Sequence, residues 1–526
     1  MEHTLRAVSR HLSRRADRCL NAWPAATAAA AGTACGLAYT STNEGPVWWF
    51  ILAAVLLSCR PLTAFAGCLA FFLTFTRYVA LDANTFFGGE GLSVLRGPLT
   101  VLALSLALSA AWAACAWVGS RLMRRGPAMA GAPRWMRTLG LRGVVAVGAV
   151  SLVSVPPLGL INVANPLTAA GALFPGQGWI GLALSLALLA LISSHREVLR
   201  WVGCFGLRPL ELTPHELMTR RVIVGGRSRS TRLPLVIFAG CLSVGAATTL
   251  MGAVGEMVAL VVPRAPEGHI AGLAMDMGRV DEGAESSRRA ALAIASELRA
   301  QMDSDGSIVA LPENALGVLN PSTSALIYRM TQANPSGDKL LALGVMVDGK
   351  QAGFGAPSLR FDAEGVKALR QVSQGVSQGR AVASAVILHR EGEPDGLVHL
   401  GLTRVPVPFA YRDSDAAAVS TGFNGPASAD VGGHRVGHLI CYEALLAPLA
   451  MESASQSTHS MVVLANNWWT GSENSNIAAA QVQTAWLAAR LFGKNLFFAS
   501  NTADPAAADR LREVLAEMER IRLGRP

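Results

Sequence analysis

Charged residues are scarce in this sequence, and lysine is especially rare. Only 15% of the 526 residues are charged, whereas 51% are hydrophobic and the mean hydropathy is +0.36. This balance excludes an ordinary soluble enzyme and favours an integral membrane protein. The N-terminal half has no lysine, so arginine alone carries its basic charge. The lysines, all in the C-terminal half, are Lys339, Lys350, Lys367 and Lys494.

The net charge of +9 does not by itself indicate a nucleic-acid-binding protein. The arginines gather in short loops between apolar segments, as the positive-inside rule predicts for a membrane protein. Residues 120–142 hold six of them and residues 194–233 hold eight. We therefore expect no direct nucleic-acid partner.

Cysteine is nearly absent from the C-terminal half. Cys441 is the only cysteine after residue 241, which excludes a disulfide within that half. The other cysteines lie in or beside apolar segments, where they behave as small hydrophobic residues. No CxxC or His–Cys ligand spacing is present, and we expect neither a metal nor a cofactor.

The first 262 residues contain the long hydrophobic runs that the composition implies. Most runs approach the ~20 residues that a helix needs to cross a bilayer. We interpret residues 1–262 as a membrane domain with about seven transmembrane helices. The second run is short, and the fifth contains Pro156 and Pro157. The expected spans cover residues 24–41, 46–59, 62–80, 98–119, 143–163, 175–193 and 234–260.

The distribution of arginine predicts the orientation of these spans. If the arginine-rich loops face the cytoplasm, seven spans place everything after residue 261 on the outer face. This predicts a multi-pass protein of the bacterial inner membrane with a periplasmic C-terminal domain, in contact with membrane lipid. Six or eight spans would instead place that domain in the cytoplasm.

Strands and helices alternate after residue 262, and this alternation predicts an α/β layered domain over residues 263–503. We expect helices at 285–302 and 476–492, and a surface excursion at 351–381, which is rich in Gly, Ser and Gln. Residues 504–526 form a charged tail with apolar residues at helical spacing, which predicts a surface helix that covers a sheet edge or binds a partner. The expected strands cover residues 269–275, 307–311, 340–347, 382–389, 397–402, 436–440, 461–465 and 496–500.

Chemically capable side chains follow three of these strands. Glu313 follows one strand in LPENAL, Cys441 closes another in ICYE, and Asn467 and Trp468 end a third in LANNWWTG. A carboxylate beside a thiol can take its proton, and the thiolate can then attack an acyl carbon to form a thioester. The alternatives are a packing role for Cys441 and a helix-capping role for Glu313. We expect a helix to begin at Tyr442, where its N-terminus would favour a thiolate.

These motifs resemble the nitrilase (carbon-nitrogen hydrolase) superfamily, and the membrane half makes the chain similar to apolipoprotein N-acyltransferase. The resemblance implies an αββα sandwich in which Glu313 is the base and Cys441 the nucleophile. It also implies phospholipid as acyl donor and a lipoprotein amine as acceptor. Tyr442, Glu443, Asn467 and Trp468 are then candidates for the substrate pocket, although Glu443 could equally be a first-turn charge.

The middle motif of this chain differs from that of the family. RVPVPFAY, residues 404–411, aligns with the family's LVPFGE-like segment, but Thr403 stands where the family has a catalytic lysine. A cation there stabilises the oxyanion of the tetrahedral intermediate. Arg404 is the adjacent candidate for this role, although its planar guanidinium is no equivalent of an ammonium.

A second resemblance accounts for this departure. The RVPVPF form of the motif is similar to that of the conjugal transfer proteins called TraB. Two hypotheses therefore follow from the sequence. One is a cysteine-dependent acyltransferase or carbon-nitrogen hydrolase of the membrane. The other is a factor for the plasmid DNA-transfer apparatus, with conjugation proteins as partners and little or no catalysis.

Overall fold

The structure is a computed structural model, and it describes fourteen longer stretches of the chain and the isolated residues 79 and 82. The stretches are 25–41, 44–77, 95–125, 134–194, 268–277, 284–303, 308–332, 339–348, 359–376, 380–390, 397–406, 417–418, 420–470 and 477–523. The expected seventh span, residues 234–260, lies outside them.

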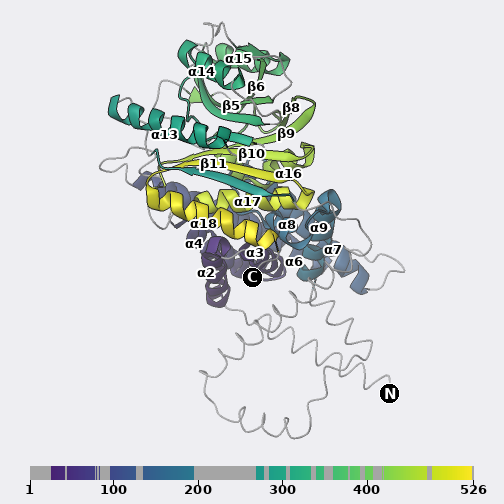
Figure 1. Ribbon diagram of the computed structural model, residues 1–526. Helices are drawn as coiled ribbons and strands as arrows, with labels where there is room; N and C mark the ends of the chain where they lie inside the picture. Colours follow the sequence, from purple (N-terminus) through teal and green to yellow (C-terminus); the bar gives the residue numbers. More distant parts are fainter. Residues whose placement is uncertain are drawn as a thin grey trace, which may run out of the picture.

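Two β-sheets pack face to face in the C-terminal half (Figure 1). The five-stranded sheet has the order β1-β11-β10-β9-β8, and only β8 is antiparallel to its neighbour. Because parallel strands end at the same edge of a sheet, the residues that follow β9 and β10 lie side by side. The strands are β1 (Ile270–Met275), β8 (Ser428–Val431), β9 (His434–Ile440), β10 (Ser460–Asn467) and β11 (Asn495–Thr502).

The second sheet has the order β2-β3-β5-β6-β4, and β7 pairs with β5. β2 runs parallel to β3, whereas β5 is antiparallel to both β3 and β6. The strands are β2 (Ile308–Leu311), β3 (Leu340–Asp348), β4 (Arg360–Phe361), β5 (Arg380–Arg390), β6 (Leu397–Leu402) and β7 (Ala417–Ala418).

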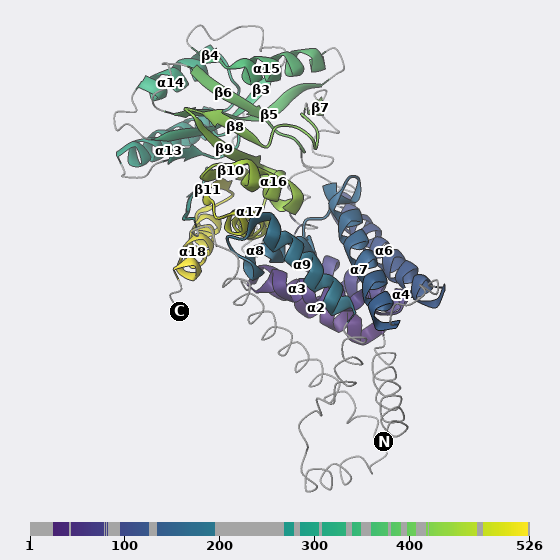
Figure 2. The same ribbon diagram turned by 90° about the vertical axis from the view of Figure 1, so that its right-hand side faces the viewer.

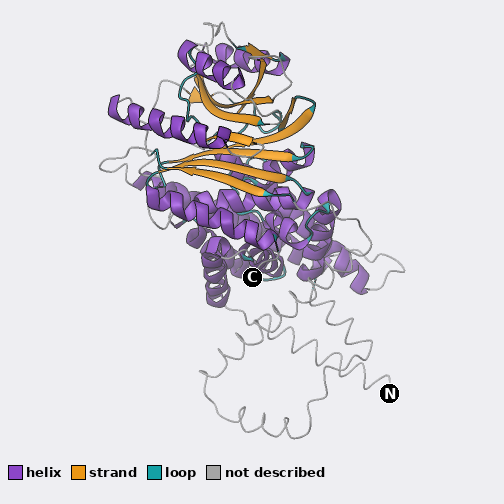
Figure 3. Ribbon diagram, in the orientation of Figure 1, coloured by secondary structure: helices purple, strands orange, loops and turns teal. Residues whose placement is uncertain are grey.

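Helices cover both outer faces, so the C-terminal half has four layers, with the sheets in the middle (Figure 3). Alternate residues of each strand face the opposite sheet, and Ala342, Val386, Ile440 and Val462 form part of the core between the sheets. The other strand faces are covered by α14 and α15 on the second sheet and by α16, α17 and α18 on the first (Figure 1). The helices are α13 (Ala284–Asp303), α14 (Pro321–Gln332), α15 (Ala363–Val376), α16 (Ala447–Gln456), α17 (Ile477–Phe492) and α18 (Pro505–Arg522).

One expectation for this half is wrong in part, and another agrees with the structure. Residues 351–381 are not only a surface excursion, because they contain β4 and the amphipathic helix α15, whose Ala368 and Val372 are buried. The tail forms α18, and Leu511, Leu515 and Met518 are buried. α18 packs against β1, the edge strand of the first sheet, which agrees with the expected edge-covering helix.

The N-terminal half is a bundle of apolar helices. Small residues allow close packing, since a Cβ on Gly32 of α2 would overlap the carbonyl of Gly67 of α4. Six of the seven expected spans coincide with helices, although the helix ends are shifted. These are α2 (Ala25–Ser41), α3 (Gly45–Leu56), α4 (Pro61–Phe75), α6 (Arg96–Arg125), α7 (Arg134–Ser154) and α9 (Gly178–Ser193).

These helices differ from the expected spans chiefly in their length. One helix of the described residues, Gly97–Met123, is long and apolar enough to cross a membrane. The bent pair Pro166–Leu173 and Gly178–Ser193 would count as a second if it forms one broken span. α3 and α4 are shorter apolar helices, and α7 ends at Ser154, before Pro156 and Pro157.

The two halves share a continuous hydrophobic core that contains Trp49 and Phe71 as well as Trp486 and Leu487. α17 lies between the first sheet and the apolar helices (Figure 2). A Cβ on Gly171, in α8 (Ala170–Leu173), would overlap the Leu487 carbonyl oxygen, so glycine is required for this close approach. The amide N–H of Gly176 also donates to the Arg490 carbonyl at 2.8 Å.

Candidate active site

Cys441 lies at the carboxyl end of β9 in a left-handed backbone conformation, with φ of +50°. Such a conformation in a non-glycine residue costs about 1–3 kcal/mol and is found preferentially at functional sites. The expected α-helix at Tyr442 is instead a 3₁₀ helix, η5 (Cys441–Leu445), and α16 begins only at Ala447. A single turn of this kind carries little of the dipole that we expected to favour the thiolate.

Glu313 forms a hydrogen bond with the thiol of Cys441. It lies in the turn after β2 and does not cap a helix, because α14 begins at Pro321. Gly344 allows this turn to lie close to β3, since a Cβ there would overlap the Pro312 carbonyl. The structure thus brings together the two side chains that the sequence proposes as base and nucleophile.

The pKa values of both groups are raised, chiefly by burial. Desolvation raises the pKa of Glu313, and the nearby Glu443 carboxylate adds to this, whereas hydrogen bonds with Ser384 and Cys441 oppose it. Desolvation and the charge of Glu313 raise the pKa of Cys441 well above its usual value. The proton therefore rests on the sulfur, and the thiolate forms when Glu313 accepts that proton.

Backbone groups provide the opposing stabilisation of the thiolate. Hydrogen bonds with the backbone at Asn466 and Tyr442 lower the pKa of Cys441. Asn466 belongs to β10 and Tyr442 to η5, so two elements meet at the sulfur. This arrangement can support attack on an acyl carbon to form a thioester.

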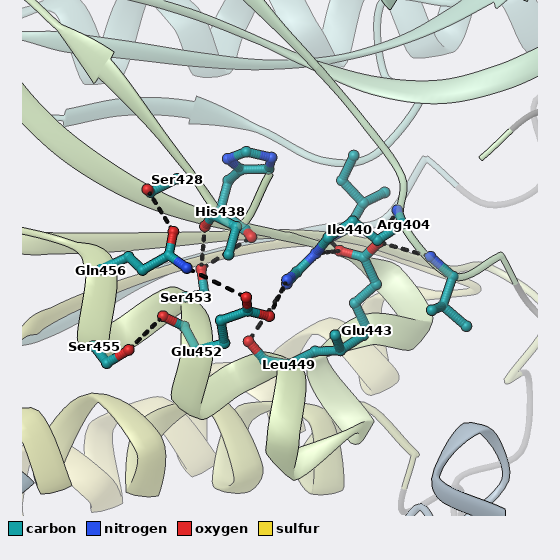
Figure 4. Close-up of polar contacts among 12 residues, drawn as sticks. Arg404, Ser428, His438, Ile440, Glu443, Leu449, Glu452, Ser453, Ser455 and Gln456 are labelled. Atoms are coloured by element: carbon teal, nitrogen blue, oxygen red, sulfur yellow. Dashed lines mark hydrogen bonds and ion pairs between the residues drawn. The ribbon is translucent and has the colours of Figure 1, made fainter. Parts of the chain in front are cut away.

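Glu443 holds together the ends of β6 and β9 (Figure 4). Its carboxylate accepts hydrogen bonds from the Val405 amide at 3.1 Å, the Ile440 amide at 3.0 Å, the Thr403 hydroxyl at 3.1 Å and the Arg404 amide. The residue is fully buried. Four donors satisfy this carboxylate inside the protein, so Glu443 fixes the turn that carries Cys441 and is not simply a pocket wall or a first-turn charge.

The guanidinium of Arg404 has its contacts beneath β9, toward α16 (Figure 4). Nη1 pairs with Glu452 at 2.9 Å, Nη2 donates to the Leu449 carbonyl at 3.4 Å, and Nε lies 4.0 Å from the Glu443 carboxylate. With the side chain buried and committed to these partners, Arg404 is a structural cation. This geometry does not support our assignment of Arg404 as the oxyanion-stabilising group. Thr403 does not take that role either, because its hydroxyl donates to the Glu443 carboxylate.

The remaining pocket candidates make interior contacts. The Tyr442 hydroxyl donates to the Leu160 carbonyl at 2.8 Å, and Trp468 packs against the shared core. The Asn467 amide donates to Gln481 Oε1 at 2.7 Å and to the Ser500 hydroxyl at 3.0 Å. Sequence reasoning missed Gln481, whose Nε2 donates to the Cys441 carbonyl at 3.2 Å. The available signal was a glutamine inside an otherwise apolar helix.

Metal-binding side chains do not gather at this site. In the part of the chain that the structure describes, no three His, Cys, Asp or Glu side chains are grouped so that they could hold a metal ion.

Comparisons with known proteins place the chain near a group of conjugation proteins. It is 27% identical to the conjugal transfer protein TraB of Agrobacterium fabrum over 449 residues, which cover 84% of each chain. It is 24% identical to the probable conjugal transfer protein TraB of Sinorhizobium fredii over 376 residues, which cover 70% of this chain and 75% of that relative. No known family model matches the sequence.

Proposed function

We propose that this chain is a membrane protein of a conjugal DNA-transfer apparatus. The similarity to a conjugal transfer protein over 84% of both chains carries this proposal. The matched region is longer than either half of the chain, so it includes residues of both the apolar helices and the α/β half. The partners would be proteins of that apparatus.

Exposed apolar side chains on the helices of the N-terminal half support the proposed membrane location. Large hydrophobic residues are exposed on three helices: Leu99 and Trp117 on α6, Val144 on α7, and Trp179 and Ile180 on α9. Each is between 49% and 68% exposed. Contact of these side chains with lipid carries no hydrophobic penalty, whereas their contact with water does.

The second candidate function is acyl transfer, and the contact between Glu313 and Cys441 favours it. In this reaction Glu313 takes the thiol proton, and the thiolate attacks the carbonyl carbon of an ester or amide donor, whose leaving group departs with a proton. The resulting thioester passes its acyl group to an amine or to water. Phospholipid and a lipoprotein amine are the donor and acceptor that the resemblance to apolipoprotein N-acyltransferase favours, within an αββα nitrilase-like domain.

A mating assay tests both candidates with one set of strains. Donor cells that lack this chain are complemented with the wild-type protein or with Cys441→Ser, and plasmid transfer per donor is counted. We expect deletion to abolish transfer and the wild type to restore it. Unchanged transfer after deletion would refute the conjugation role.

The cysteine variant separates the two functions. Loss of transfer with Cys441→Ser at normal membrane abundance would make the acyl-transfer chemistry part of the conjugation role. Full restoration by Cys441→Ser would leave a non-catalytic assembly factor. Cys115→Ser, in α6 of the apolar half, is the matched control and should restore transfer fully.

A further inference from the structure

The backbone of Cys441 is held by a side chain from a distant helix. Gln481 of α17 donates from Nε2 to the Cys441 carbonyl oxygen at 3.2 Å, and both residues are buried. This carbonyl belongs to the first residue of η5, directly after β9 ends at Ile440, and that residue has a φ of +50°. The amide of Gln481 therefore binds the peptide group that follows Cys441, and the orientation of this peptide group affects where the sulfur lies.

The orientation of the Gln481 amide is determined by its neighbours. Its Oε1 accepts from Asn467 Nδ2 at 2.7 Å, and the same nitrogen donates to the Ser500 hydroxyl at 3.0 Å. A flipped amide would place Oε1 against the Cys441 carbonyl and an NH₂ against another NH₂. Asn467 and Ser500 are both fully buried, so no water replaces these bonds.

We propose that Gln481 is a positioning residue that holds Cys441 in its left-handed conformation, with the sulfur against Glu313. The proposal deepens the acyl-transfer candidate and rests on it. Without the amide donor, the buried carbonyl loses the side-chain hydrogen bond that fixes its direction, and the turn relaxes toward an ordinary backbone conformation. The sulfur then leaves the backbone groups of Asn466 and Tyr442 and the carboxylate that would take its proton.

The same contact connects the site with the apolar half. α17 packs on α8 at Gly171, on the face opposite the sheet, and its C-terminal end binds the Gly176 amide. The position of Gln481 is thus set by how α17 lies on the bent helix pair.

Three variants of the full-length protein, purified in detergent, test this role. Gln481→Met removes both hydrogen bonds at nearly constant volume. Gln481→Glu is isosteric and, when protonated, both donates to the Cys441 carbonyl and accepts from Asn467. Thr484→Val is the matched control, because Thr484 is equally buried on α17 and its hydroxyl has no partner among the described residues.

Two reactions of Cys441 are measured by mass spectrometry of its peptide. The first is acylation by p-nitrophenyl hexanoate, which requires base and nucleophile in contact and releases p-nitrophenolate. The second is alkylation by iodoacetamide as a function of pH, which requires no catalysis. Thermal denaturation of each variant measures its stability.

We expect Gln481→Met to slow acylation roughly tenfold. Its alkylation midpoint should move to lower pH by about half a unit, because the sulfur loses its buried place beside Glu313. Thr484→Val should change neither reaction, and Gln481→Glu should match the wild type at low pH and Gln481→Met at high pH. Denaturation midpoints at the same pH values separate positioning from a purely structural role, because a structural role would lower stability in parallel with acylation.

Equal profiles for Gln481→Met and Thr484→Val would overturn the proposal, as would a Gln481→Glu variant that never differs from Gln481→Met. If Gln481→Met does not fold, the pH dependence of Gln481→Glu still decides. A wild type that is alkylated but never acylated would refute acyl transfer. The alkylation profiles would then still decide whether Gln481 positions Cys441.

Discussion

The hydroxyl of Tyr442 donates a 2.8 Å hydrogen bond to the carbonyl of Leu160, which lies 282 residues away in the sequence. Tyr442 directly follows the candidate nucleophile, and Leu160 ends η2 (Leu158–Leu160) in the apolar half. Together with the packing of α17 on α8, this bond places the candidate active site next to the junction of the two halves. Changes at that junction should therefore be felt at Cys441.

The closest approach in the junction predicts a destabilising glycine substitution. Gly171→Ala introduces a Cβ that overlaps the Leu487 carbonyl, so α8 or α17 must move. We expect a loss of roughly 1–3 kcal/mol, measured as a lower midpoint of thermal denaturation in detergent. Gly148→Ala in α7 is the control, because nothing lies within 4 Å of its added Cβ. Equal midpoints for the two variants would refute the tight contact.

Removal of the Glu313 charge should change two reactions of Cys441 in opposite directions. Burial and the charge of Glu313 both raise the pKa of the Cys441 thiol. Glu313→Gln removes the second cause, so alkylation by iodoacetamide should become faster at a given pH. Acylation should slow by roughly 10²-fold or more, because the base is lost. A variant that slows both reactions equally would argue against this pair.

The buried guanidinium of Arg404 predicts a stability effect and not a catalytic one. Arg404→Met removes the ion pair with Glu452 and the contact near Glu443, which should cost roughly 3 kcal/mol of unfolding free energy. The control is Lys367→Met, which removes an exposed pair with Glu364 and should cost at most about 0.5 kcal/mol. Acylation per folded Arg404→Met molecule should remain within about threefold of the wild type. A large loss at unchanged stability would restore Arg404 as a catalytic cation.

The imidazole of His438 predicts a loss of stability in acid. Its ring lies between the sheets, where a Cβ on Gly401 would be 2.7 Å from Nε2, and neither ring nitrogen has a hydrogen-bond partner among the described residues. Burial holds the pKa of His438 well below its usual range, and the charges of His399 and Arg404 lower it further. His399 is itself paired with Asp362 at 2.7 Å.

A depressed histidine pKa in the folded state means that the unfolded chain binds the proton first as pH falls. Stability is therefore complete above about pH 6.5 and decreases below it, by at most about 1.4 kcal/mol for each pH unit. Denaturation midpoints at pH 7.5 and 5.5 should differ less in His438→Leu than in the wild type. His434→Leu, at the start of the same strand, should keep the wild-type difference. Parallel profiles for wild type and His438→Leu would contradict this assignment.

Much of the α/β half could be predicted from the sequence because its strands are short apolar runs bounded by polar residues. The runs at 397–402 and 436–440 correspond to β6 and the end of β9. Residues 351–381 were misjudged because Gly, Ser and Gln conceal the apolar period of α15. In the apolar half, composition located the helices but could not foresee that α4, expected over residues 62–80, would end at Phe75, since helix ends depend on packing.

The sequence alone determined that reactive groups follow strands, so that Glu313 and Cys441 lie at strand ends where they can meet. That much follows from local hydrophobic patterns, which are read within a few residues. Only the tertiary structure decided where Arg404 points, that Glu443 joins two strand ends, and that Gln481 holds the Cys441 carbonyl. These depend on side chains from elements far apart in the chain, whose register and rotation are set by packing and not by the local order of residues.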